Sequence, residues 1–143
     1  LMRTVTTPKR ALGFILCGLF VASLAPTALA FANNHADTPY RFQLAYGAHA
    51  DTENRPKYDD TSTYINCERN TGVAIVQSNG WQMGSTYSWG PKYPVGRGEQ
   101  FIYNYVWENR PRTDVAAYCY LRFSNPDEKR TITTQGLWSP DSV

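Results

Sequence analysis

The chain has 143 residues, of which 42% are apolar and 14% aromatic, and its 14 Lys and Arg stand against 12 Asp and Glu. Three of the basic residues lie in the first ten positions, so residues 31–143 keep 11 basic and 12 acidic side chains, a net charge of about −1. This balance excludes the strongly basic surface that attracts nucleic acid or an anionic membrane, and the length suits one domain.

Residues 1–30 have the organisation of a cleaved signal peptide. A basic start is followed by an apolar run over residues 11–25 and by Ala28-Leu29-Ala30, the small-x-small pattern that a signal peptidase cuts. The apolar run is too short to favour a membrane-spanning helix, so no stable membrane insertion is expected. A second, overlapping frame leaves Phe31 or Asn33 as the start of the mature protein. We therefore expect a secreted, extracellular domain over residues 31–143.

Alternating apolar and polar residues predict six or seven short strands and no helix in the mature chain. In chain order the predicted strands are residues 40–46, 63–67, 73–78, 81–89, 100–108, 115–123 and 131–138. Asn79-Gly80 predicts a turn after the third of these strands. Residues 48–60 are rich in Asp, Asn and Pro and are expected not to pack. The pattern as a whole predicts an all-β fold, a small antiparallel β-sandwich.

Two cysteines, Cys67 and Cys119, remain after the predicted loss of Cys17 with the signal peptide. A lone pair in an exported protein most simply forms a disulfide, and the alternation of both strands turns the two side chains toward the core. Two buried free thiols are the alternative interpretation. The pair is too far apart in sequence for a Cys-x-x-Cys redox or zinc motif.

Aromatic side chains gather on one face of the predicted strand over residues 100–108, namely Phe101, Tyr103, Tyr105 and Trp107. Because the opposite face is also apolar, the favoured interpretation is a central strand buried on both sides, with Trp107 in the core. The alternative is an exposed aromatic platform on which sugar rings stack.

A second set of aromatic residues provides the predicted binding site. The alternation of side chains that turns Cys119 toward the core turns Tyr118 and Tyr120 outward. Trp81 and Trp89 are the tryptophans that could join them on this surface. We predict that these four side chains bind a component of the cell envelope, with a cell-wall glycan as the leading candidate.

No catalytic constellation is recognisable, and no catalytic residue, cofactor or metal is predicted. His35 and His49 are the only histidines, and neither a Ser nor a Cys lies in a known nucleophile frame. The spacing of Glu99 and Glu108 puts them on opposite faces of a regular strand, which disfavours a glycosidase pair. The acidic cluster in residues 51–60 lacks EF-hand spacing and is interpreted as a solvated loop. We expect a protein that is not an enzyme.

Three parts of the sequence resemble a known family. They are the segment Asp37-Thr38-Pro39-Tyr40-Arg41-Phe42, the basic Arg55 and Lys57 before Tyr64, and the closing Gly136-Leu137-Trp138-Ser139-Pro140-Asp141-Ser142. It is a family of small exported Gram-positive proteins catalogued as a domain of unknown function, the 2712 family. The resemblance implies a β-rich exported domain and supplies no activity. The cysteine pair departs from the family pattern, so the resemblance does not support the disulfide.

A looser similarity is to lactococcin-type bacteriocins, which are also small, exported, antiparallel β proteins rich in Trp and Tyr. This similarity rests on Trp81, Trp89 and the strand from Tyr118 to Phe123. The sequence therefore predicts a secreted, non-catalytic domain that binds a cell-envelope component, and a bacteriocin-like antimicrobial protein is the alternative.

Overall fold

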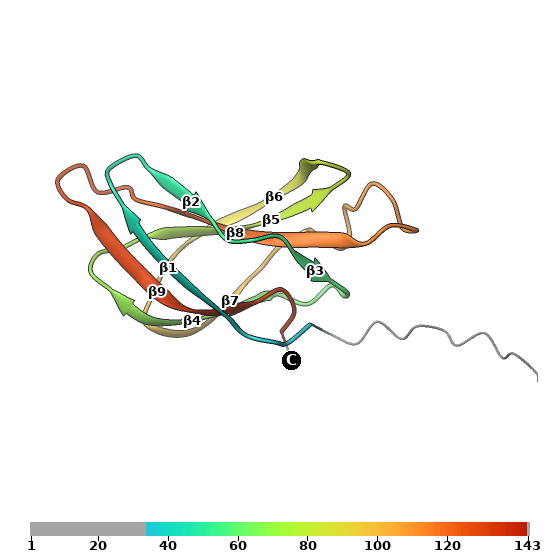
Figure 1. Ribbon diagram of the computed structural model, residues 1–143, viewed down its shortest axis with the longest axis horizontal. Helices are drawn as coiled ribbons and strands as arrows, with labels where there is room; N and C mark the ends of the chain where they lie inside the picture. The colour runs from blue at the N-terminus through green and yellow to red at the C-terminus, as the bar shows by residue number, and fades with distance from the viewer. Residues whose placement is uncertain (1–33, 143) are drawn as a thin grey trace, which may run out of the picture.

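The computed structural model describes residues 34–142, which form two packed β-sheets (Figure 1). The strands are β1 (Thr38–Leu44), β2 (His49–Asp51), β3 (Arg55–Lys57), β4 (Thr63–Asn70), β5 (Ile75–Gln82), β6 (Ser85–Pro94), β7 (Gly98–Ile102), β8 (Ala117–Ser124) and β9 (Ile132–Ser139). The predicted signal peptide, Cys17 and both candidate mature starts, Phe31 and Asn33, lie outside the described residues.

The two sheets form an antiparallel sandwich, which confirms the predicted fold class. One sheet has the strand order β1-β9-β4-β7, and the other has the order β2-β8-β5-β6 with β3 also paired to β8. All paired strands are antiparallel. Within residues 34–142, no helix is long and apolar enough to cross a bilayer.

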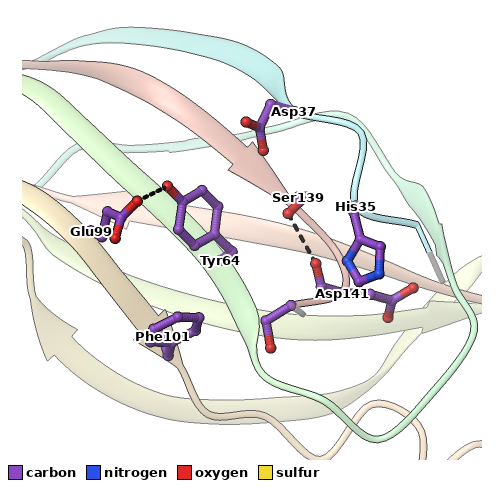
Figure 2. Close-up of a pocket in the computed structure, with 8 residues that line it drawn as sticks. His35, Asp37, Tyr64, Glu99, Phe101, Ser139 and Asp141 are labelled. Carbon is purple, nitrogen blue, oxygen red and sulfur yellow. Dashed lines mark hydrogen bonds between the residues drawn. The ribbon is translucent and has the colours of Figure 1, made fainter.

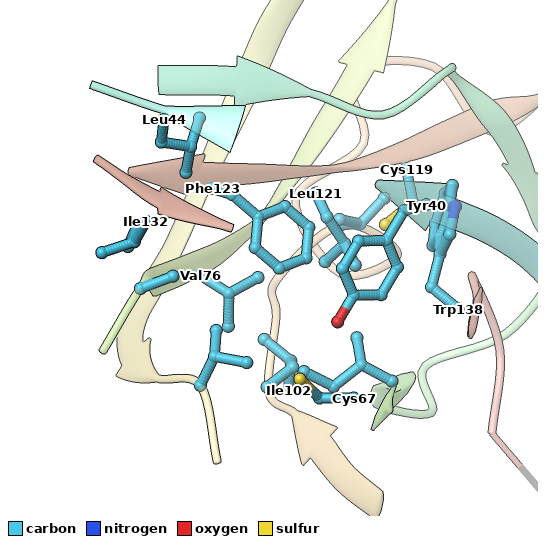
Figure 3. Close-up of a cluster of buried hydrophobic side chains, with 14 of the residues drawn as sticks. Tyr40, Leu44, Cys67, Val76, Ile102, Cys119, Leu121, Phe123, Ile132 and Trp138 are labelled. Atoms are coloured by element: carbon cyan, nitrogen blue, oxygen red, sulfur yellow. The ribbon is translucent and has the colours of Figure 1, made fainter. Parts of the chain in front are cut away.

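The core lies between the sheets, where the alternation of each strand places its apolar side chains (Figure 3). Cys119, Leu121 and Phe123 of β8 are fully buried, as the predicted phase of this strand requires. From the other sheet, Tyr40 stacks on Phe123 with 4.7 Å between ring centroids, and Trp138 is fully buried. Two facing apolar layers of this kind supply most of the driving force for folding.

The predicted turn at Asn79-Gly80 is wrong, because both residues lie inside β5. The hairpin turns instead at Met83 and Gly84, whose φ angles of 52° and 84° give the two-residue loop the left-handed backbone that such hairpins favour. Gly80 has a packing role. A Cβ at this position would lie 2.7 Å from the Tyr87 ring, so the strand accommodates that ring only with glycine here.

Residues 48–60, expected not to pack, contribute two strands that the sequence pattern did not predict. β2 and β3 both pair with β8, and they raise the number of strands in residues 34–142 to nine. Lys57 of β3 is fully buried against Asp141, with 2.9 Å between Nζ and Oδ1. A polar segment packs here because its charge is neutralised by a partner that is distant in the sequence.

The long strand predicted over residues 100–108 is also wrong. β7 ends at Ile102, and it is an edge strand rather than a central one. Phe101, Tyr103 and Tyr105 are 59%, 45% and 40% exposed, so they are not core residues. Asn104 is buried in the turn that follows the strand, where its side chain accepts from the Val106 N–H. Such side-chain bonds to the backbone compete with strand pairing.

Trp107, which was expected in the core of that strand, follows the same turn. It is partly buried against the core, and the Arg110 guanidinium carbon lies 3.8 Å from the centroid of its ring. Its outer face is therefore covered by a cation rather than by another apolar layer.

The predicted disulfide is also corrected, because Cys67 and Cys119 are free thiols. Both are buried in the core as the phase argument required, but they lie on facing sheets with separate partners. The Cys119 sulfur is 3.2 Å from the Ser78 hydroxyl, and Cys67 donates to the Arg69 carbonyl at 3.4 Å. Figure 3 draws the two sulfur atoms apart, with the Tyr40 side chain between them in this view. A shared core face does not bring two Cα atoms within the 7 Å or so that a disulfide requires.

Candidate functional site

The four predicted binding residues lie on one surface, the outer face of the five-stranded sheet. Because Cys119 and Leu121 of β8 face the core, Tyr118 and Tyr120 between them face outward. Trp81 of β5 pairs directly with Tyr118, and residue 79 of β5 pairs with Tyr120 on one side and Trp89 of β6 on the other. Residues directly opposite on neighbouring strands share a face, so strand register brings all four together.

The four aromatic side chains are not equally accessible. Trp89 is 52% exposed, whereas Tyr120 is only 5% exposed although it points outward. The Tyr120 hydroxyl lies 2.9 Å from the Thr86 hydroxyl. Trp81 and Tyr118 are half-buried and pack edge to face, with ring centroids 6.1 Å apart. Trp89 is therefore the most exposed of the four aromatic side chains, and the others pack around it.

Arg122 joins these aromatic residues into one surface. Its guanidinium lies 5.2 Å from the centroid of the Trp89 ring and 6.0 Å from that of Tyr120. Its Nε and Nη2 donate to the two carboxylate oxygens of Asp51, each at 2.7 Å. These bonds raise the pKa of Arg122. A two-pronged pair of this kind holds the guanidinium in a single orientation.

Two shallow hollows adjoin along this face and share Arg122. One, of about 230 Å³, is lined by Trp81, Tyr120 and Asp51 among others. The second, of about 370 Å³, is bordered by the exposed Trp89. We call the surface formed by Trp81, Trp89, Tyr118, Tyr120, Arg122 and Asp51 the outer-face cluster. It combines an exposed indole with fixed polar groups, as small-ligand sites commonly do.

Sequence reasoning omitted two members of the outer-face cluster. The alternation of β8 placed Arg122 on the same side as Tyr118 and Tyr120, so its position was predictable although no role was assigned to it. Asp51 was interpreted as part of a solvated loop. No local signal identifies it, because it reaches Arg122 only through the pairing of β2 with β8 across 71 residues.

A third hollow, of about 360 Å³, lies beside the end of β9, with Asp37 and Ser139 in its lining (Figure 2). Tyr64 donates to Glu99 there at 2.9 Å, and burial together with this carboxylate raises the pKa of Tyr64. Asp141 also lines this hollow, but its carboxylate accepts from Lys57 and from the backbone of Asn34. The polar groups here tie together the two ends of the described chain, so we assign this hollow a structural role.

The residues considered for catalysis are scattered. His35 lines the hollow of Figure 2 and His49 lies on β2, in the other sheet. Glu99 is bonded to Tyr64, and Glu108 is exposed in the turn after β7. Among residues 34–142, no three His, Cys, Asp or Glu side chains are grouped as a metal site. Absence of enzymatic activity and of a cofactor stays a prediction.

Comparison with known proteins identifies a family but no activity. A family model described as "Protein of unknown function (DUF2712)" matches residues 28–142. No curated protein and no solved structure matches the chain. The resemblance to the 2712 family is thereby confirmed, and the similarity to lactococcin-type bacteriocins is not supported.

Proposed function

Because this chain belongs to that family of proteins of unknown function, its membership supplies no activity, and we propose from the geometry that the domain is an exported, non-catalytic glycan-binding module. It binds a polysaccharide of the cell envelope on the outer-face cluster. The observation that carries the proposal is the exposed Trp89 ring beside the fixed pair of Arg122 and Asp51.

Trp89 supplies the stacking surface. The negative face of an indole attracts the weakly positive C–H groups of a sugar ring, and contact releases water from both apolar surfaces. With 52% of its surface exposed on a sheet strand, the ring is available without rearrangement of the backbone. A ring held on a rigid strand loses little conformational entropy when a ligand binds.

The polar neighbours of Trp89 match the hydroxyl groups of a sugar. Arg122 keeps its Nη1 donor beside the Asp51 carboxylate, and Thr86 lines the adjoining hollow. Both oxygens of Asp51 are engaged by Arg122, so this carboxylate fixes the guanidinium in the orientation that it presents to a ligand.

The proposal is tested by pull-down of the mature protein on purified cell walls, with a panel of soluble polysaccharides titrated in parallel. We expect Trp89→Ala to weaken binding by about tenfold or more, as the loss of a central aromatic contact does. Its melting temperature should change little, because an exposed side chain is removed.

Phe101→Ala is the matched control, since Phe101 is 59% exposed on the opposite sheet, beside the hollow of Figure 2. It should bind walls and polysaccharides as the unaltered protein does. If Phe101→Ala lost binding while Trp89→Ala kept it, the ligand would bind to the four-stranded sheet and the proposed site would be wrong. If the unaltered protein bound neither walls nor any polysaccharide, the proposed function would be wrong.

A further inference from the structure

We propose that the hollow beside Trp89 selects an acidic glycan, one whose sugars bear a carboxylate or a phosphodiester, through Lys92 and Arg122. This inference rests on the proposed function and names the ligand class of the same site. Its basis is the charge that lines the 370 Å³ hollow, where Lys92 and Arg122 lie beside Trp89.

Strand register places the two cations on either side of one residue. Gln77 of β5 pairs with Arg122 of β8 and with Lys92 of β6, so all three side chains share the outer face. Two strand spacings separate the backbones of Lys92 and Arg122, a distance of about 10 Å. The long Lys92 side chain is able to reach an oxyanion held beside the Arg122 guanidinium, which Asp51 keeps in place.

Part of the hydrogen-bonding capacity of this hollow is not used within the protein. Lys92 is exposed, and its ammonium makes neither an ion pair nor a hydrogen bond among the described residues. Arg122 gives Nε and Nη2 to Asp51 and keeps Nη1 without a hydrogen-bond partner. Gln77 donates to the Gly90 carbonyl at 2.6 Å and keeps its own carbonyl oxygen for a ligand hydroxyl.

The positive lining is local and not a consequence of overall charge. Residues 31–143 carry slightly more acidic than basic side chains, yet no acidic residue of the described chain lines this hollow. Asp51 instead faces the smaller neighbouring hollow. Because charges beyond about 8 Å are screened at physiological salt, an oxyanion bound here responds mainly to Lys92 and to Arg122, whose charge Asp51 partly balances. A neutral sugar would leave Lys92 without an ionic partner.

The test measures binding of the full mature protein to three polymers, polygalacturonate, polyglycerol phosphate and a neutral glucan, by titration calorimetry. We expect at least one acidic polymer to bind about tenfold more tightly than the glucan. That preference should fall as salt rises from about 50 mM to about 500 mM. The tighter of the two acidic polymers identifies carboxylate or phosphodiester as the recognised group.

Lys92→Glu should reduce binding of the preferred acidic polymer about tenfold or more and leave the weaker glucan binding unchanged. Arg69→Glu is the matched control, because Arg69 is exposed on β4 of the opposite sheet and the charge change is identical. Lys92→Gln, which removes the charge without reversing it, should give an intermediate loss.

Equal affinity for acidic and neutral polymers, or equal effects of Lys92→Glu and Arg69→Glu, would overturn this inference and leave glycan binding itself standing. No binding to any polymer or to cell walls would overturn both the inference and the proposed function. Melting temperatures of the three variants verify that each is folded, and Lys92→Gln serves in place of Lys92→Glu if the latter is not.

Discussion

Replacing Lys57 with methionine tests the packing of the β3 segment. Lys57 and Asp141 are both fully buried, with 2.9 Å between Nζ and Oδ1. The ammonium also donates to the carbonyls of Thr61 and Pro140, at 2.6 Å and 2.7 Å. Lys57→Met keeps an unbranched side chain that is one atom shorter and removes all three bonds. The Asp141 carboxylate then stays buried without its cation, while the backbone N–H groups of Asn34 and Tyr58 still donate to it.

Removing one partner of a buried ion pair costs about 3–5 kcal/mol, because the remaining charge is desolvated without compensation. The Thr61 carbonyl still accepts from Asn104, so Pro140 is the carbonyl left without its partner. We expect a loss of about 4 kcal/mol in the free energy of unfolding. For a domain whose total stability is about 5–15 kcal/mol, this is a large fraction.

Urea unfolding followed by tryptophan fluorescence measures the loss, since Trp138 is fully buried and reports on the core. Lys92→Met is the control, because Lys92 is exposed, and it should change stability by less than about 0.5 kcal/mol. The double variant Lys57→Met with Asp141→Asn should recover part of the loss, because its buried group is uncharged. A cost below about 1 kcal/mol for Lys57→Met would refute the buried pair and with it the placement of β3.

Two further predictions concern residues buried in the core. Gly80→Ala should destabilise by about 1–3 kcal/mol in a urea melt, because the new Cβ would lie 2.7 Å from the Tyr87 ring; Gly96→Ala, with its nearest atom at 3.7 Å, should cost far less. Under non-reducing conditions, iodoacetamide followed by mass spectrometry should label both Cys67 and Cys119 once the protein is unfolded. In the native state Cys119 should stay unlabelled, because burial raises the pKa of its thiol and the reactive thiolate is scarce. A species two hydrogens lighter that resists labelling would contradict the free thiols.

Local alternation determined much of the fold without help from the structure. The phases of β4 and β8 were correct, because each strand has one face apolar enough to reveal which side meets the core. The same reasoning placed Tyr118 and Tyr120 on the outer side of β8. Turn signals were less reliable. The Asn-Gly pair at residues 79–80 predicted a hairpin turn, but both residues lie inside β5.

The pairing of distant strands decided the rest, because a strand's neighbours determine whether its outer residues are exposed, covered or charged. Alternation alone could not show that β7 is an edge strand. It also could not show that Tyr120 is buried, with its hydroxyl beside that of Thr86, while Trp89 is exposed. It likewise could not pair Asp51 with Arg122. A residue's phase is a property of its own strand, whereas register and burial depend on contacts between segments far apart in the chain. The sequence therefore determined the sandwich and the aromatic candidates, and only the tertiary structure brought these residues together on one face.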